Sequence, residues 1–183
     1  MAGERESRRE ACVAKAAAEA SSLEGRGVLL AGQALSSVLL LKGEPAPGDL
    51  SDGPLAGADG AALRAALSTL GYAPEDWVAM LSCDSAGTPL EPSLLREAIC
   101  ALDPATVVAC DEAAAEALRQ AYPDELAAVD DFDEAMLRPG CVAHVLGMRV
   151  LALGGFADAL SVDGAKREMW HRLKRIPPLG EPY

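Results

Sequence analysis

Lys42-Gly43-Glu44-Pro45-Ala46-Pro47-Gly48 follows an apolar run, residues 37–41, that has the length and branching of a buried strand. The loop is rich in Gly and Pro and leads to a helical pattern, residues 59–70, for which Asp59 is the expected N-cap. In open α/β sheets, ligand sites lie outside the carboxyl ends of strands, in loops of this kind. Glu44 is therefore a candidate functional carboxylate, whereas the plainer interpretation is a simple turn between strand and helix.

Strand and helix patterns alternate along the rest of the chain. The further expected strands are residues 77–82, 106–110, 141–146 and 149–153, of which the last two form a hairpin. The further expected helices are residues 4–21, 93–102, 112–121 and 164–175, and Asp111 is the expected N-cap of the helix at 112–121. This order predicts one three-layer α/β/α domain over residues 1–183, with an N-terminal helix at 4–21 and a core at 36–176. Its central sheet is expected to be four-stranded and mostly parallel.

Composition and charge narrow the expected partners. The net charge of −12 disfavours DNA and RNA, because their binding depends on cations that neutralise phosphates. The chain shows no apolar window of membrane-spanning length and no signal-peptide pattern. Its five scattered Cys favour reduced thiols. We therefore expect a cytoplasmic protein that binds no membrane and whose partner is an unidentified small ligand or protein.

Two acidic segments carry much of the negative charge. Asp49 and Asp52 lie just after Glu44, where they would attract a cation rather than a phosphate. The second segment is expected to be an irregular, solvated loop with one helical turn at residues 132–137, and as a functional hypothesis it would contact a basic partner. Its acids are Asp124, Glu125, Asp130, Asp131, Asp133 and Glu134.

Four short segments follow one another in an order known from a protein family. They are residues 43–48, 54–60, 88–109 and 165–170. On these segments the chain resembles the uracil-DNA glycosylase superfamily, and it is most similar to the iron–sulfur branch from bacteria and archaea. The likeness extends from Ala11 to Ile176, with one extra residue between Glu44 and Pro47. It implies a uracil-DNA glycosylase-like fold and a DNA-repair hydrolase that flips a base and removes it, with Glu44 as the catalytic carboxylate.

The base pocket implied by the resemblance is only partly retained. Its ligand-binding positions are Gly43, Pro47, Gly48, Leu55, Gly57, Met80, Gly155 and Asp158. Leu55 stands where the family stacks the base on an aromatic ring, and Met80 stands at about the position of the Asn that reads the uracil edge. The last loop, residues 154–158, has no His to stabilise the departing anion. The resemblance therefore implies a divergent member with a degenerate active site that lacks ordinary uracil excision.

Two alternative functions stay open at this point. One is an active DNA glycosylase of altered base preference, in which Glu44 is the catalytic carboxylate. Residues 154–158 would then replace the missing His, through backbone N–H groups or through Asp158. The other is a small-ligand or protein-binding module on the same fold, which would use the crevice beside Glu44 or the acidic surface.

The cysteine pattern of the resembled branch is incomplete. That branch holds an iron–sulfur cluster with four Cys, and Cys12, Cys83 and Cys100 match three of the positions. Lys15 occupies the remaining position, which is the second of the four. We therefore expect no cofactor and interpret these thiols as free Cys. A cluster completed by another ligand is the alternative.

Overall fold

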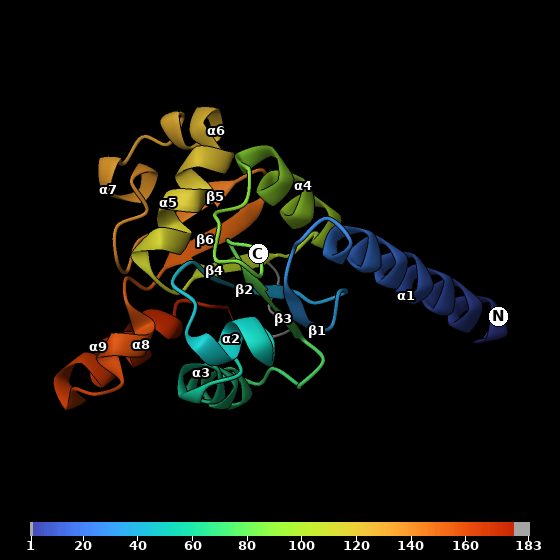
Figure 1. The fold of residues 1–183 in the computed structure, drawn as a ribbon, viewed down its shortest axis with the longest axis horizontal. Helices are drawn as coiled ribbons and strands as arrows, with labels where there is room; N and C mark the ends of the chain where they lie inside the picture. Colours follow the sequence, from blue (N-terminus) through green and yellow to red (C-terminus); the bar gives the residue numbers. More distant parts are fainter. Residues whose placement is uncertain (1, 178–183) are drawn as a thin grey trace.

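The centre of the protein is a six-stranded mixed sheet, in a computed structural model that describes residues 2–177 (Figure 1). The strands are β1 (Leu30–Gly32), β2 (Val38–Lys42), β3 (Trp77–Leu81), β4 (Thr106–Ala109), β5 (Val142–Val145) and β6 (Met148–Ala152). Their order across the sheet is β1-β3-β2-β4-β6-β5. Neighbours in the series β3-β2-β4-β6 pair in parallel, whereas β1 and β5 pair antiparallel at the two edges.

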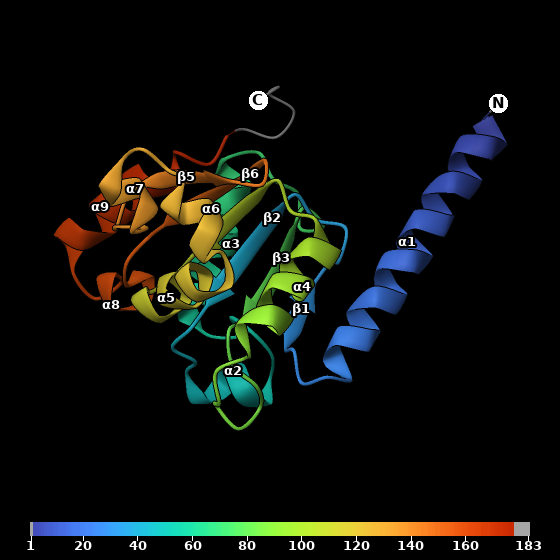
Figure 2. The same cartoon turned by 90° about the horizontal axis from the view of Figure 1, so that it is seen from above.

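Helices fill most of the connections in the described part of the chain. They are α1 (Ala2–Glu24), α2 (Pro47–Ser51), α3 (Ala58–Thr69), α4 (Pro92–Leu102), α5 (Glu112–Ala121), α6 (Pro123–Ala127), α7 (Phe132–Ala135), α8 (Phe156–Ala159) and α9 (Asp163–Leu173). The first turns of α1 project away from the rest of the molecule (Figure 2). Among the described residues, no helix combines the length and the apolar character needed to cross a membrane.

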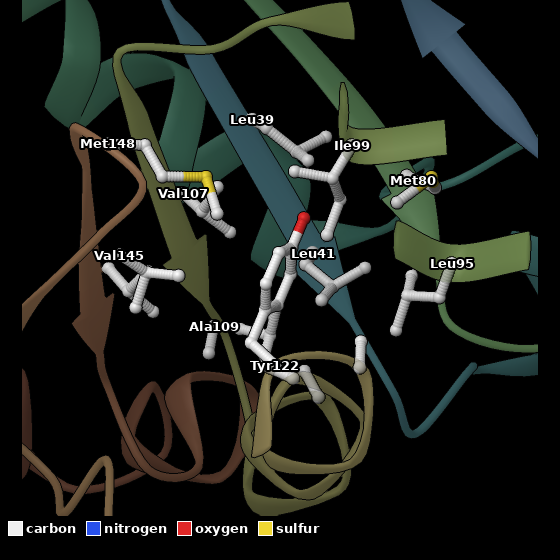
Figure 3. Close-up of a cluster of buried hydrophobic side chains, with 14 of the residues drawn as sticks. Leu39, Leu41, Met80, Leu95, Ile99, Val107, Ala109, Tyr122, Val145 and Met148 are labelled. Atoms are coloured by element: carbon white, nitrogen blue, oxygen red, sulfur yellow. The ribbon is translucent and has the colours of Figure 1, made fainter. Parts of the chain in front are cut away.

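Alternation along the strands divides the core between the two faces of the sheet. Leu39 and Leu41 of β2 point to one face, where they join a cluster that includes side chains of α4 and α5 (Figure 3). Val38 and Leu40 point to the other face, where they join a cluster that includes side chains of α3, α8 and α9. Burial on both faces explains why the central strands read as continuous apolar runs.

The expected four-stranded sheet is corrected to six strands. One additional strand is β1, which is only three residues long, and the other is β5, whose expected hairpin with β6 is confirmed. The turn between β5 and β6 has positive φ at both Leu146 (50°) and Gly147 (86°), as in the two-residue turns that match strand twist. A strand as short as β1 has too few residues to produce an alternating pattern, so its place in the sheet was not predicted.

The other differences from the expected elements concern helix ends and the acidic segment. The N-terminal helix covers residues 2–24 rather than 4–21. The acidic segment contains two short helices: α7 lies within the helical turn expected at residues 132–137, whereas α6 was not predicted. Proline at the first position of α6 and the Asp131 carboxylate at the start of α7 each favour a helix N-terminus.

Candidate functional site

The candidate site lies at the carboxyl ends of β2, β4 and β6. After β2 the chain continues through α2 into α3, which packs on one face of the sheet, and after β4 it continues into α5, which packs on the other face. Since β2 and β4 are neighbouring parallel strands, their loops separate and leave a crevice between them. Glu44 follows β2, Asp111 follows β4 and Gly155 follows β6, so three loops meet at this crevice.

A buried ion triad forms the interior of the crevice. The Lys42 ammonium at the end of β2 donates to the carboxylates of Asp49 on α2 and Asp59 on α3, with both N–O distances 2.5 Å. The side chains of Lys42, Asp49 and Asp59 are only 5%, 0% and 10% exposed. The Asp49 carboxylate also accepts the backbone N–H groups of Ala46 (2.8 Å) and Ala56 (3.2 Å). The triad therefore ties both helices after β2 to the end of that strand.

The electrostatics of the triad favour the charged forms of Lys42 and Asp59. Burial acts to lower the pKa of Lys42, but hydrogen bonds and charge attraction from Asp49 and Asp59 outweigh it, so that its pKa is raised. Burial acts to raise the pKa of Asp59, but hydrogen bonds from Lys42 and from the Gly60 N–H outweigh it, so that its pKa is lowered. Lys42 is thus held as a cation whose donors point at protein carboxylates rather than at a ligand.

Asp111 joins the loops after β2 and β4. Its carboxylate caps α5 by accepting the Ala114 N–H at 2.8 Å, as the sequence predicted. It also accepts the backbone N–H groups of Gly43 and Glu44, each at 3.0 Å. A Cβ at Gly43 would lie only 2.3 Å from the Ala114 nitrogen, so only glycine permits this close approach. Asp111 and Gly43 therefore set the position of Glu44.

Replacement of Asp111 by Ala is expected to lower the free energy of unfolding by about 2–3 kcal/mol, because a cap is lost and two more N–H groups lose their acceptor. Asp131 is the matched control, since it caps α7 at an exposed position without joining two loops. Asp131→Ala is expected to cost about 1 kcal/mol or less. Urea unfolding of both variants measures the difference, and equal losses would contradict the joining role of Asp111.

The open part of the crevice is small. A cavity of about 40 Å³ lies beside Lys42 and Asp59, and Glu44, Phe156 and Asp158 also line it. Glu44 and Asp158 are exposed to solvent beside this cavity, whereas Phe156 is buried. The N–H groups of Gly155 and Phe156 both donate to the Cys110 carbonyl, at 3.2 and 2.9 Å. These two donors are therefore already used and do not point at a bound anion.

The structure brings together some of the candidate residues and separates others. Glu44, Gly155 and Asp158 line one cavity. Leu55 is fully buried in the cluster on the α3 face, and Met80 is fully buried in the cluster on the opposite face (Figure 3). Met80 faces away because successive strand residues alternate between the faces, and Val78 and Met80 share the α4 side.

The remaining candidates belong to the loop and helices after β2. Pro47 and Gly48 begin α2, Gly57 is the N-cap residue of α3, and Gly43 contacts α5 as described above. None of these four lies among the residues that line the cavity.

Sequence reasoning missed the most buried residues of the site. Lys42 was taken as the end of a strand, and Asp59 was expected to be an N-cap, whereas Gly57 holds that position. Asp49 was expected to attract a cation, and the cation it binds is the Lys42 ammonium of the same chain. A lysine at the end of an apolar strand, followed by two aspartates in the next helices, was the available signal.

The three Cys that match the cluster pattern do not lie together. Cys12 on α1 and Cys100 on α4 are exposed and line one cleft of about 740 Å³. Cys83 is buried after β3 and is not among the residues that line this cleft. Burial and nearby carboxylates raise the pKa of the Cys83 thiol. Within residues 2–177, no three His, Cys, Asp or Glu side chains are grouped so that they could hold a metal ion.

Comparison of the sequence with protein-family models finds none that matches. Comparison with curated proteins finds no match either.

Proposed function

We propose that this protein is a divergent member of the uracil-DNA glycosylase superfamily whose crevice no longer excises uracil. In this proposal the fold is the α/β/α fold of that superfamily, and the residues at the strand ends hold the fold together instead of binding a base. Glu44 remains at the position of the catalytic carboxylate, but the groups that would bind and release a base are absent.

The size and content of the crevice carry this proposal. The cavity of about 40 Å³ has room for a few water molecules, since one water needs about 10–15 Å³ of such space. Pockets for organic ligands commonly measure about 300–1,000 Å³. The Lys42–Asp49–Asp59 triad occupies the interior beneath Glu44. Opening this space for a flipped base would expose or break buried ion pairs, which is costly.

Electrostatics at the entrance support the same proposal. Glu44 and Asp158 are both exposed at the cavity, so a phosphate backbone that approaches them meets two carboxylates. The overall charge of −12 acts in the same direction. The donors at Gly155 and Phe156 are engaged by the Cys110 carbonyl, which leaves the departing anion without these hydrogen bonds.

One observation favours the active alternative. The buried ring of Phe156 lines the same cavity as Glu44 and Asp158, so an aromatic side chain, a general base and an acid are neighbours. An active glycosylase of altered base preference would need this loop to move so that the ring faces a base. Its activity would depend on the Glu44 carboxylate.

A base-release assay distinguishes the two. The full chain is incubated with single- and double-stranded oligonucleotides that contain uracil, hypoxanthine or xanthine, and abasic sites are cleaved and counted. We expect no release above the background without protein, and no difference between the unchanged protein and Glu44→Ala. Release that disappears in Glu44→Ala would overturn the proposal and establish the active alternative.

A further inference from the structure

An apolar groove lies on the acidic segment, away from the crevice. It has a volume of about 470 Å³ and its apolar wall includes Leu126, Val129, Phe132 and Met136, which we call the α6–α7 groove. Phe132 is 66% exposed and Met136 is 40% exposed. In Figure 1, α6 and α7 lie at the end of the molecule remote from α2 and α3. An exposed aromatic ring and an exposed thioether in one concave surface are typical of a protein interaction site.

Carboxylates outnumber cations around the α6–α7 groove. Residues 123–138 contain six carboxylates and one basic side chain, Arg138, whose guanidinium lies 5.7 Å from the centre of the Phe132 ring. Arg119 of α5 also lines the groove, but Glu112 and Glu116 pair with it. Several of these carboxylates are already engaged: Glu125 pairs with Arg96, Asp131 caps α7 and Asp133 pairs with Arg138 at 3.1 Å. Asp124, Asp130 and Glu134 have no side-chain partner among the described residues. Their charge is therefore available to a positively charged partner.

The groove is held in place by its own hydrogen bonds. Arg119 of α5 donates to the Met136 carbonyl at 2.8 Å, which fixes the end of α7 against α5. The Asp131 carboxylate accepts the N–H groups of Asp133 and Glu134, which fixes the start of α7. A partner would therefore meet a preformed surface and lose less free energy to ordering.

We propose that the α6–α7 groove binds a basic amphipathic helix of another protein. Apolar side chains on one face of that helix cover Phe132 and Met136, and Lys or Arg side chains beside them face Asp124, Asp130 and Glu134. The charge complementarity identifies the partner class, because the negative rim repels nucleic acids, anionic membranes and acidic segments. The inference is independent of the function proposed for the crevice.

The first test uses a synthetic 18-residue helix of Leu and Lys with one apolar face, and a matched peptide in which every Lys is Glu. Phe132→Ser with Met136→Ser removes apolar surface without changing the charge of the protein. We expect it to weaken binding of the Leu/Lys peptide about ten-fold by fluorescence anisotropy. Val162→Ser is the control, since Val162 is 56% exposed at the start of α9, and we expect it to change binding less than two-fold.

The second test distinguishes attraction of the peptide to the carboxylates at the rim of the groove from attraction to the overall negative charge of the protein. Asp130→Asn with Glu134→Gln and the control pair Glu75→Gln with Glu91→Gln each remove two exposed or half-buried carboxylates. We expect only the first pair to weaken binding, by about three-fold or more at low salt, and we expect added salt to reduce its effect. All of these side chains are at least partly exposed, so urea unfolding should show each variant folded.

Three outcomes would overturn the proposal. The first is equal binding of the Leu/Lys peptide to the unchanged protein and to the Phe132→Ser, Met136→Ser variant. The second is equal weakening by both pairs of charge substitutions, which would mean attraction to the overall charge alone. The third is a concentration-dependent dimer, seen by analytical ultracentrifugation and lost in the Phe132→Ser, Met136→Ser variant, which would mean that a second copy covers the groove.

Discussion

Replacement of Lys42 by Met is expected to lower the free energy of unfolding by about 3–5 kcal/mol, as for other buried charges that lose their partner. Met has a similar length and fills the same space, so the change removes the charge with little change in volume. The Asp49 and Asp59 carboxylates would then face each other and an apolar side chain, at positions 0% and 10% exposed. Urea unfolding followed by circular dichroism measures the loss.

Lys15→Met is the matched control for this substitution. Lys15 pairs with Glu19 at 3.6 Å on the surface of α1, and its side chain is 78% exposed. Exposed pairs of this kind contribute about 0.5 kcal/mol or less, so we expect almost no change. A Lys42→Met variant as stable as Lys15→Met would contradict the role of the triad in holding α2 and α3 to the strand end.

A triple variant tests why Lys42→Met lowers the free energy of unfolding. In Lys42→Met, Asp49→Asn, Asp59→Asn the three charges of the triad are removed. The amide oxygen introduced at position 59 can still accept the Gly60 N–H, but the one at position 49 can accept only one of the Ala46 and Ala56 N–H groups, which donate to different oxygens of Asp49. We expect the triple variant to recover about 1–2 kcal/mol relative to Lys42→Met alone, because the unpaired carboxylates cost more than one lost hydrogen bond. No recovery would mean that packing or hydrogen bonding, and not an unpaired charge, causes the loss.

Replacement of Gly60 by Ala is expected to cost about 3 kcal/mol, the second large effect. Gly60 lies in the first turn of α3, and a Cβ there would stand 1.8 Å from the Leu55 carbonyl oxygen. The obstacle is backbone, and Leu55 already has a left-handed conformation with φ 58°, so the turn has little freedom to move. The same shift would displace Asp59 from Lys42. Thermal and urea unfolding measure the effect.

Gly164→Ala is the control for Gly60→Ala. Gly164 also lies in the first turn of a helix, α9, but no atom lies within 4 Å of the position of an added Cβ. Alanine at this position is expected to leave the free energy of unfolding unchanged or to raise it by about 0.5 kcal/mol, because alanine loses less conformational entropy than glycine when the helix forms. Similar losses in both variants would mean that the contact with Leu55 is not the cause.

Prediction from sequence was most successful where the pattern is local. Each central parallel strand is a short apolar run, and its burial on both faces follows from that composition. Asp111 was recognised as a helix cap because a cap requires only the next three residues. The family resemblance placed both Glu44 and Asp158 in the implied pocket, and the two residues line the same cavity, while their roles stay a prediction.

Prediction was weaker where the partner is distant in the chain or the element is short. Asp59 and Asp111 look alike as acids before a helix, yet Asp59 pairs with Lys42 and Asp111 caps α5. Leu55 and Met80 were grouped in one pocket, but alternation along β3 places Met80 on the opposite face from Leu55. The hairpin of β5 and β6 was predicted, but the edge strand β1 was not, because its pairing with β3 depends on its neighbour and not on its own composition.

The sequence by itself determined the alternation of strands and helices, the parallel centre of the sheet and the acidic character of residues 124–134, since these depend on local composition and hydrophobic period. Only the tertiary structure decided which charged side chains form ion pairs. The Lys42 ammonium pairs with Asp49 and Asp59, which lie 7 and 17 residues further along the chain, because α2 and α3 pack beside the end of β2. It also decided that Phe132 and Met136 share an exposed groove, because α6 and α7 fold onto α5 and leave these side chains without a cover.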